Sequence, residues 1–382
     1  MSRPNLGSGA RLIVKIGSAS LVGGAGVPGD STLDRLCADI AEVRNRGIDV
    51  VLVSSGAIAA GLAPLSLQAR PSDIPSLQAA AAVGQGRLMA HYDRALASHG
   101  LTCAQILLTR HDIMDRQRYL NARNTIDRLL ALGAVPIVNE NDTVATDEIR
   151  FGDNDRLAAL VANLAGASLL VLLTDADGLH EADPRRVPGA PLVSEIEKIT
   201  PEIERTAGGR GSELASGGMA SKIAAAWVAT FSGVGVVVAN AKEEKVVGRI
   251  ADGEVLGTFF HPRPGRKTSA RRLWIAFGQP PRGTITVDDG ARGAVTTGKR
   301  SLLAVGVTDV IGTFDAGDAI DVQDRKRRVF ARGLVRYSST DLHAARGRST
   351  VELGQGEVIH RDQLVILERG ERGSDEPGGD KR

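Results

Sequence analysis

The chain has 382 residues, of which 42% are hydrophobic, 24% charged and 3% aromatic, and its formal net charge is +2 at pH 7. This composition excludes disorder over most of the length, because a disordered chain needs fewer hydrophobic residues or a larger net charge. The length predicts two or three domains. The only two cysteines, Cys37 and Cys103, are too far apart for a disulfide framework or a CxxC site, which favours a reducing, cytoplasmic location.

Metal and membrane sites are not predicted. The seven histidines include no HExxH motif and no pair at i, i+4, so a protein-held metal is not expected. The apolar run before Lys15 is too short for a signal peptide. Two uncharged stretches, residues 157–174 and 223–241, are each interrupted by a glycine-containing turn, so we expect a helix, a turn and a strand rather than a membrane span.

In chain order, the first two-thirds of the sequence alternates short apolar runs with longer amphipathic segments. The runs that predict buried strands are residues 12–16, 50–53, 104–108, 135–138, 169–173 and 234–238. The segments that predict helices are residues 32–46, 76–98, 116–132, 156–164 and 218–231. This alternation predicts an α/β fold with a mostly parallel sheet sandwiched between helix layers, whose ligands gather at the carboxyl ends of the strands.

The last third differs in composition. After a proline-rich basic stretch it contains short strand-like runs at residues 284–287, 319–322, 329–335 and 364–367. We predict an α/β domain over residues 1–260, a linker over 261–280, a small β-rich domain over 281–368 and a disordered tail over 369–382. Residues 261–382 carry 22 Lys and Arg against 16 Asp and Glu. The basic run at 325–328 either binds nucleic acid or lies on a solvent-exposed turn. Taken by itself, such a run favours the interpretation as a turn.

Two glycine motifs resemble phosphate loops. Residues 24–29 match GxGxxG, but they begin well beyond the end of the first strand and contain a proline. Residues 293–300 match GxxxxGK, but Arg300 stands where a Ser or Thr must ligate magnesium. We therefore predict neither a dinucleotide fingerprint nor a P-loop.

Other polar groups follow the predicted strands. Lys15 ends the first strand, and the glycine-rich run 216–222 opens a helix that carries Lys222, so two lysines at helix or strand ends could clamp one phosphoryl group. The small residues at 54–57 suit a carboxylate, and the polar loops at 139–143 and 151–155 flank one strand. Each segment alone is as well explained by helix capping or turn formation.

Taken together, these segments resemble the glutamate 5-kinases of the amino-acid kinase superfamily. The matching segments are KIGS at 15–18, SSGAIAAG at 54–61, LLTR at 107–110, NAR at 121–123, VNENDTVAT at 138–146, FGDND at 151–155, LLTDADGL at 172–179, ADPR at 182–185 and SGGMASK at 216–222. The resemblance covers residues 11 to about 260. Residues 301–322 resemble a PUA domain, a small β-barrel known from RNA-modifying enzymes.

The resemblance implies that ATP phosphorylates the γ-carboxylate of L-glutamate to give L-glutamyl 5-phosphate, the first step of proline biosynthesis. A glutamate side chain has a reference pKa near 4.3, so the nucleophile is already ionised at neutral pH and needs no general base. Catalysis would then rest on positioning and charge stabilisation.

The resemblance also assigns residues. Lys15 and Lys222 would stabilise the transferring phosphoryl group, and Asp155 would hold both lysines. Ser55, Asp142 and Asn154 would bind glutamate, with Asp142 the partner of its ammonium group. The implied ATP site comprises Lys15, Gly17, Ser18, Thr174, Asp175, Ser216, Gly217, Gly218, Met219, Ala220, Ser221 and Lys222. Magnesium would be held mainly through phosphates and water. Ala19 stands where the family usually has a serine, which affects only a minor contact beside Lys15.

The implied partners are L-glutamate, ATP, proline as feedback inhibitor and further copies of the chain in a dimer or tetramer. Three alternatives remain open, and one of them is that the PUA-like domain binds RNA as an added activity, which a PUA fold by itself does not imply. Another kinase of the superfamily, acting on N-acetylglutamate, aspartate, carbamate or a nucleoside monophosphate, would share the lysines, although the VNEND segment and the second domain favour glutamate. An RNA-binding protein with the kinase fold as a scaffold would use its basic second domain, although the intact lysines and glycine loops argue against it.

Overall fold

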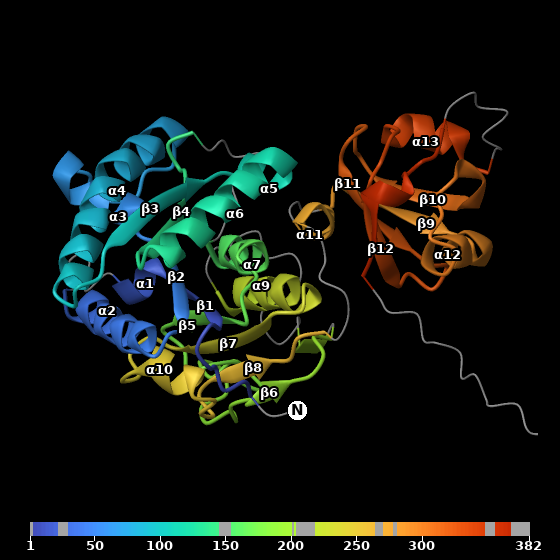
Figure 1. The fold of residues 1–382 in the computed structure, drawn as a ribbon. Coiled ribbons are helices and arrows are strands. Elements are labelled where there is room, and N and C mark those ends of the chain that lie inside the picture. Colours follow the sequence, from blue (N-terminus) through green and yellow to red (C-terminus); the bar gives the residue numbers. More distant parts are fainter. Residues whose placement is uncertain are drawn as a thin grey trace, which may run out of the picture. The chain divides into compact units, whose positions relative to one another are not determined.

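The computed structural model describes residues 3–21, 30–144, 154–200, 202–203, 218–263, 270–277, 281–347 and 356–367. The chain divides into two compact units, Met1–Ala270 and Arg271–Arg382, each with its own sheet (Figure 1). The predicted tail at 369–382 and the GxGxxG motif at 24–29 lie outside the described residues. No helix in the described part of the chain is long and apolar enough to cross a membrane.

An eight-stranded sheet with the order β3-β4-β2-β1-β5-β7-β8-β6 forms the centre of the first unit. Its strands are β1 (Arg11–Ile16), β2 (Asp49–Ser54), β3 (Cys103–Leu108), β4 (Val135–Glu140), β5 (Leu169–Thr174), β6 (Glu195–Ile196), β7 (Gly235–Asn240) and β8 (Thr258–Phe260). The six predicted strands, β3, β4, β2, β1, β5 and β7, are consecutive in the sheet and all pair in parallel, which confirms the predicted, mostly parallel architecture. The two short strands β8 and β6 at one end of the sheet were not predicted; β8 runs antiparallel to β7, and β6 runs parallel to β8.

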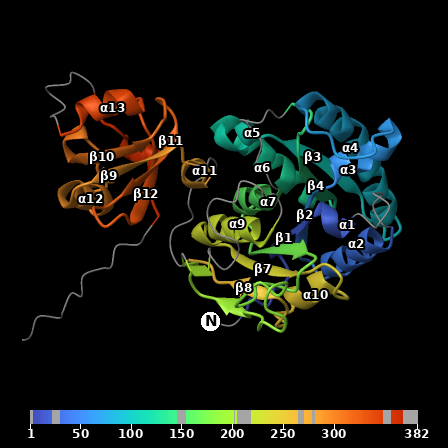
Figure 2. The same cartoon turned by 180° about the vertical axis from the view of Figure 1, so that it is seen from behind.

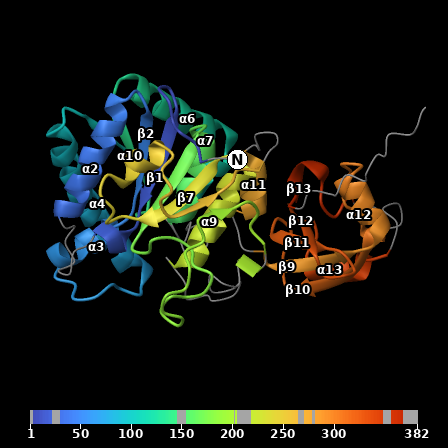
Figure 3. The ribbon, with the colours of Figure 1, turned by 90° about the horizontal axis from the view of Figure 1, so that it is seen from below.

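Helices cover both faces of this sheet. They are α1 (Ser18–Leu21), α2 (Asp30–Asn45), α3 (Ala57–Leu62), α4 (Ile74–Ala97), α5 (Arg110–Met114), α6 (Arg116–Ala131), α7 (Asn154–Leu164), α9 (Met219–Phe231) and α10 (Val246–Ala251), with a 3₁₀ turn η1 (Ala63–Leu65). Helices α2, α4 and α10 pack on one face, and α6, α7 and α9 pack on the other (Figure 3). Side chains alternate along a strand, so Val14 and Ile16 enter the core under α2 and α4 whereas Lys15 points toward α7.

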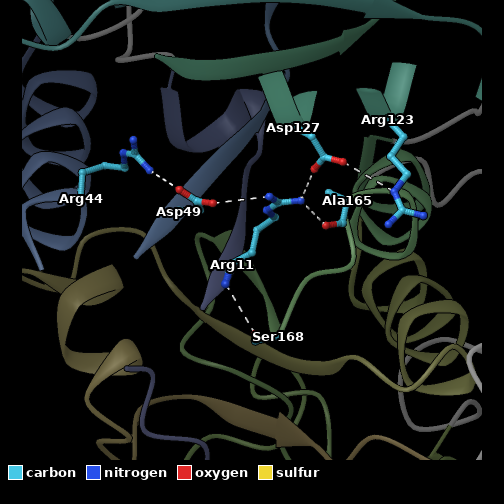
Figure 4. A network of polar contacts seen from close by, with 7 residues as sticks. All are labelled: Arg11, Arg44, Asp49, Arg123, Asp127, Ala165 and Ser168. Atoms are coloured by element: carbon cyan, nitrogen blue, oxygen red, sulfur yellow. Dashed lines mark hydrogen bonds and ion pairs between the residues drawn. The ribbon is translucent and has the colours of Figure 1, made fainter. Parts of the chain in front are cut away.

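The amino-terminal edge of the sheet is held by an arginine (Figure 4). The guanidinium of Arg11 contacts Asp49 of β2 at 3.4 Å, Asp127 of α6 at 2.7 Å and the carbonyl of Ala165 after α7 at 2.5 Å. Arg44 of α2 contacts the other oxygen of Asp49 at 2.5 Å. The starts of β1 and β2 are thereby tied to both helix layers, at the edge opposite to the carboxyl ends of the strands.

The second unit contains a five-stranded sheet with the order β10-β9-β11-β12-β13 (Figure 2). Its elements are α11 (Ala270–Phe277), β9 (Gly283–Val287), α12 (Asp289–Thr296), η2 (Ala304–Gly306), β10 (Val307–Gly312), β11 (Ala319–Gln323), β12 (Val329–Leu334), α13 (Ser339–Ala345), η3 (Arg361–Gln363) and β13 (Leu364–Ile366). All pairings are antiparallel except that of β9 with β11. Helix α11 lies within the predicted linker 261–280, and the predicted domain limits stay a prediction.

The GxxxxGK motif lies in this second unit. Its first four residues, 293–296, belong to α12 and the rest follow the end of that helix. A P-loop connects a strand to the start of a helix, so this segment has the wrong place in the fold to hold a phosphate in that way.

Candidate active site

The carboxyl ends of four neighbouring strands bring the predicted site residues to one edge of the sheet. Lys15 lies at the end of β1, Ser55 follows β2, Asp142 follows β4 and Thr174 ends β5. The order β4-β2-β1-β5 makes these strands direct neighbours, although they are far apart in the sequence. Parallel strands end on the same side, which explains why the motifs converge.

The carboxylate of Asp155 lies between two lysine ammonium groups. Its Oδ1 is 2.5 Å from Nζ of Lys15, and its Oδ2 is 3.2 Å from Nζ of Lys222. The hydroxyl of Ser221 also donates to Oδ2 at 2.9 Å. Asp155 is fully buried and both lysines are 4% exposed. Ion pairs this deeply buried need close geometry and hydrogen bonds to offset their desolvation, and this cluster has both.

Three elements place these charges. Lys15 points from β1 toward α7, Asp155 is in the first turn of α7, and Lys222 is in the first turn of α9. Helices α7 and α9 pack against each other, so their first turns meet beside the end of β1. An acidic residue in the first turn of α7 is also favoured by the helix dipole.

The lysines set the ionisation of Asp155. Burial by itself raises the pKa of this carboxyl, but the charges of Lys15 and Lys222 and the hydroxyl of Ser221 outweigh burial and hold its pKa below the ordinary value. The carboxylate is therefore ionised at neutral pH. Two ammonium groups and one carboxylate give the three side chains a net charge of +1, which suits a phosphoryl group.

Beside this cluster, Asn154 connects the β2 and β4 loops. Its Nδ2, which carries two hydrogens to share among them, lies 2.9 Å from Oγ of Ser55, 3.0 Å from the carbonyl oxygen of Ser54 and 2.9 Å from Oδ1 of Asn139. Two residues predicted to bind glutamate, Ser55 and Asn154, are thus in direct contact. Asp142 lies half-buried in the turn that follows β4.

The residues predicted to bind ATP lie at the ends of β1 and β5 and at the start of α9. Gly17 and Ser18 follow β1, and Thr174 is buried with its hydroxyl donating to Asp175 at 3.0 Å. Helix α9 begins at Met219 after the extended Gly218 and contains Ala220, Ser221 and Lys222. Ser216 and Gly217 lie outside the described residues, as do residues 151–153 of the FGDND segment.

Sequence reasoning missed one polar layer behind this site. Asn139 is the buried, penultimate residue of β4. Its Nδ2 donates a hydrogen bond to Oε1 of Gln85 in α4 at 2.8 Å. The hydroxyl of Tyr92, which also belongs to α4, lies 2.8 Å from the hydroxyl of Ser54 in β2. Asn139 belonged to a recognised motif, but Gln85 and Tyr92 lie in an amphipathic helix whose periodicity predicts packing and gives no sign of polar contacts.

Comparison with known proteins identifies the family. Residues 10–240 match the model of the amino acid kinase family. The chain belongs to the amino acid kinase family. Residues 283–356 of this amino acid kinase match the PUA domain model. The predicted fold is therefore confirmed in both units.

Curated relatives match this amino acid kinase over nearly its whole length. A protein of Geobacter sp. (strain M21) named glutamate 5-kinase is 47% identical over 364 residues, which are 94% of this chain and 97% of the relative. A protein of the same name from Myxococcus xanthus (strain DK1622) is 44% identical over 372 residues, 96% of this chain and 98% of the relative. One from Thermoanaerobacter sp. (strain X514) is 43% identical over 369 residues, 95% and 99% of the two chains. The predicted resemblance to glutamate 5-kinases is confirmed.

Proposed function

We propose that this chain is a glutamate 5-kinase. It transfers the γ-phosphoryl group of ATP to the γ-carboxylate of L-glutamate and forms L-glutamyl 5-phosphate and ADP, the first step of proline biosynthesis. The observation that carries the proposal is the buried cluster of Lys15, Asp155 and Lys222 beside the contacting pair of Ser55 and Asn154. The relatives named glutamate 5-kinase support the choice of acceptor.

In this reaction the difficulty is to bring an anionic carboxylate to a polyanion. Lys15 and Lys222 neutralise charge on the transferring phosphoryl group, and they act from a buried site in which water screens them little. Asp155 positions both ammonium groups, so they are in place before the reaction and need no rearrangement during it. The attacking carboxylate is ionised at neutral pH, so no side chain has to accept a proton from it.

The two substrates occupy opposite sides of the lysine cluster in this proposal. Glutamate is bound by Ser55 and Asn154, with the carboxylate of Asp142 facing its ammonium group. We propose that ATP is bound by residues at the ends of β1 and β5 and at the start of α9. These residues are Lys15, Gly17, Ser18, Thr174, Asp175, Ser216, Gly217, Gly218, Met219, Ala220, Ser221 and Lys222. The first turn of α9 favours phosphate through its backbone amide groups and its dipole.

Magnesium fits this site as MgATP. Among the described residues no three His, Cys, Asp or Glu side chains gather around one point, and the carboxylate of Asp155 is engaged by two lysines. An ion that keeps several waters and binds phosphate oxygens needs no such cage. When bound, it neutralises charge on the phosphates, and the protein's own contribution is to hold the triphosphate against the lysines.

The decisive experiment is an assay of the purified protein with MgATP and L-glutamate, in which hydroxylamine traps the acyl phosphate and ADP release is followed. Aspartate, N-acetylglutamate, carbamate and UMP serve as control acceptors. We expect hydroxamate only with glutamate. Activity with another acceptor alone would keep the fold and overturn the substrate.

A matched pair of lysine variants tests the site. Lys222→Ala is expected to lower kcat by about a thousandfold while the protein stays folded, because it removes charge stabilisation of the transition state. Lys245→Ala, which removes an exposed lysine paired with Glu42, should keep the wild-type kcat. Near-normal turnover of Lys222→Ala would remove Lys222 from the mechanism.

Further partners are part of the proposal. We infer a cytoplasmic homo-oligomer, a dimer or tetramer, that proline inhibits, and the PUA domain gives RNA as a candidate ligand of the second unit. Gel shifts with structured RNA at several salt concentrations test that partner, since phosphate contacts weaken steeply as salt rises. Hydroxamate formation measured at increasing proline concentrations tests inhibition by proline. The molar mass from light scattering tests the oligomeric state.

A further inference from the structure

Helix α4 carries a buried amide that no substrate-binding motif includes. Gln85 lies near the middle of α4, is 9% exposed and presents Oε1 to Nδ2 of Asn139 at 2.8 Å. Helix α4 is linked to the site here by side-chain contacts, from Gln85 to Asn139 and from Tyr92 to Ser54, while Ser55 follows β2 and Asn154 begins α7. The contact therefore belongs to a layer behind the residues proposed to touch glutamate.

The hydrogen bonds around Asn139 require one orientation of its amide. Its Oδ1 accepts two bonds, from Nδ2 of Asn154 at 2.9 Å and from the backbone N–H of Glu140 at 2.8 Å. Rotating the amide by 180° would turn its own NH₂ group toward those two donors and lose both bonds. The correct orientation leaves Nδ2 facing α4, where it needs an acceptor, because an unsatisfied buried donor is costly.

Gln85 supplies that acceptor. The chain of contacts then runs from Gln85 to Asn139, from Asn139 to Asn154, and from Asn154 to the hydroxyl of Ser55. Tyr92, seven residues further along α4, adds a second contact on the same side of the helix by bonding the hydroxyl of Ser54. One face of α4 thus contacts Ser54 at the end of β2 and Asn139 near the end of β4, the two strand ends next to Ser55 and Asn154.

We propose that Gln85 is a positioning residue for the acceptor site, which sets the affinity for glutamate by fixing Asn139 and, through it, the amide of Asn154. The inference rests on the proposed function, since it assigns Asn154 to glutamate. Gln85 itself touches neither substrate. Its loss should therefore affect binding of the acceptor and leave the lysine cluster and ATP binding unchanged.

The test compares three variants in the full chain by steady-state kinetics and thermal unfolding. Gln85→Met keeps the volume but removes the carbonyl acceptor, and we expect it to raise KM for glutamate about tenfold with KM for ATP within twofold of wild type. Gln85→Glu keeps an acceptor oxygen in either protonation state, so KM for glutamate should return to within about threefold of wild type. Leu88→Ala removes a buried apolar side chain of the same helix and should lower the melting temperature with little change in KM.

Three results would overturn the inference. An unchanged KM for glutamate in Gln85→Met would show that Asn139 needs no acceptor from α4. An equal rise in Gln85→Glu, or in Leu88→Ala, would show that packing of α4 matters and the acceptor does not. The wild-type protein is assayed first. If it forms no hydroxamate with glutamate, the proposed function is refuted as well. If the wild type is active and Gln85→Met has an unchanged KM for glutamate, only the role of Gln85 is refuted.

Discussion

At the scale of single residues, Asp155 is the side chain on which two others depend. One carboxylate contacts both buried lysines, so its neutralisation leaves two ammonium groups with less compensation in a site that excludes water. Breaking a buried ion pair by removing one partner typically costs about 3–5 kcal/mol. The arrangement thus makes the stability of the first unit depend on the same residue that positions the proposed catalytic lysines.

We therefore expect Asp155→Asn to lose hydroxamate formation and to unfold with a free energy about 3–5 kcal/mol lower than wild type at pH 7. Because the pKa of Asp155 is lowered in the folded protein, its stabilisation is present above the ordinary aspartate value and is lost as pH falls through the lower folded pKa. Denaturant titrations should show a constant difference from pH 7 to about pH 4, closing only in stronger acid. A difference that closed between pH 7 and 5 would contradict this assignment.

His180 provides a second pH dependence, of opposite sign. Its Nε2 lies 2.7 Å from Oδ1 of Asp177 and its Nδ1 lies 2.7 Å from the carbonyl of Ala190. Both partners accept hydrogen bonds, so the doubly protonated ring satisfies both and the pKa of His180 is raised, chiefly by Asp177. The resulting stabilisation is complete below the ordinary histidine value near 6.5 and is lost as pH rises through the folded pKa.

Asp177→Asn should accordingly lower the free energy of unfolding at pH 5.5 and match wild type at pH 8.5, as measured by urea denaturation across that range. The control is Asp183→Asn in the same loop. Asp183 pairs with Arg185, which does not titrate in this range, so any destabilisation should be independent of pH. A pH-independent effect of Asp177→Asn would mean that His180 does not change its protonation state between pH 5.5 and 8.5.

At the scale of elements, helices α3 and α4 cross with backbone against backbone. A Cβ added at Gly84 would lie 1.8 Å from the carbonyl oxygen of Ala57, and one added at Gly61 would lie 1.9 Å from that of Ala80. Neither backbone atom can move aside alone. Because α3 begins two residues after Ser55, the closeness of this crossing also fixes one wall of the proposed glutamate site.

Gly84→Ala should force α3 away from α4, destabilise the protein by about 1–3 kcal/mol and raise KM for glutamate. Gly86→Ala is the matched control in the same helix, because an added Cβ there meets nothing within 4 Å. Alanine is the better helix former, so the control should be neutral or more stable by up to about 1 kcal/mol. Thermal unfolding and steady-state kinetics decide, and a stabilised Gly84→Ala would refute the close crossing.

The elements also show what sequence could predict. Uniformly apolar runs identified the six parallel strands, because strands buried on both faces have no polar alternation. The short strands β6 and β8 have two and three residues, too few for any periodicity. The small residues at 54–57 are interpreted as the start of a helix, and α3 begins there at Ala57. Family resemblance located Asp155, but only the strand order brings it to Lys15, and no local pattern marks Gln85.

At the scale of the whole molecule, each unit has its own hydrophobic core. The core of the second unit surrounds Phe330, which is 1% exposed and packs with residues of β9, β11 and α13 such as Ile285, Ile320 and Leu342. The described residues of the proposed site all lie in the first unit. A substitution that destabilises the core of the second unit should therefore leave the phosphoryl transfer proposed for the first unit unchanged.

Phe330→Ala is expected to cost the second unit about 3–5 kcal/mol and to lower its calorimetric transition by roughly 10 °C or more, with hydroxamate formation at 25 °C unchanged. Val305→Ala, a truncation of an exposed side chain in the same unit, should leave both transitions in place. If Phe330→Ala shows one calorimetric transition for the whole chain and that transition moves to lower temperature, the two units do not unfold independently.

The position of β1 at the centre of the sheet has a consequence for biosynthesis. This strand is made first, yet one of its neighbours, β5, begins at Leu169 and the helix that carries Lys222 begins at Met219. At roughly 5–20 residues per second, a ribosome needs on the order of 10–40 s to pass from Lys15 to Lys222. Asp155 and β5 are translated before Lys222, so Lys15 gains its carboxylate and its second neighbouring strand first, and the two-lysine cluster is complete only when most of the first unit has been translated.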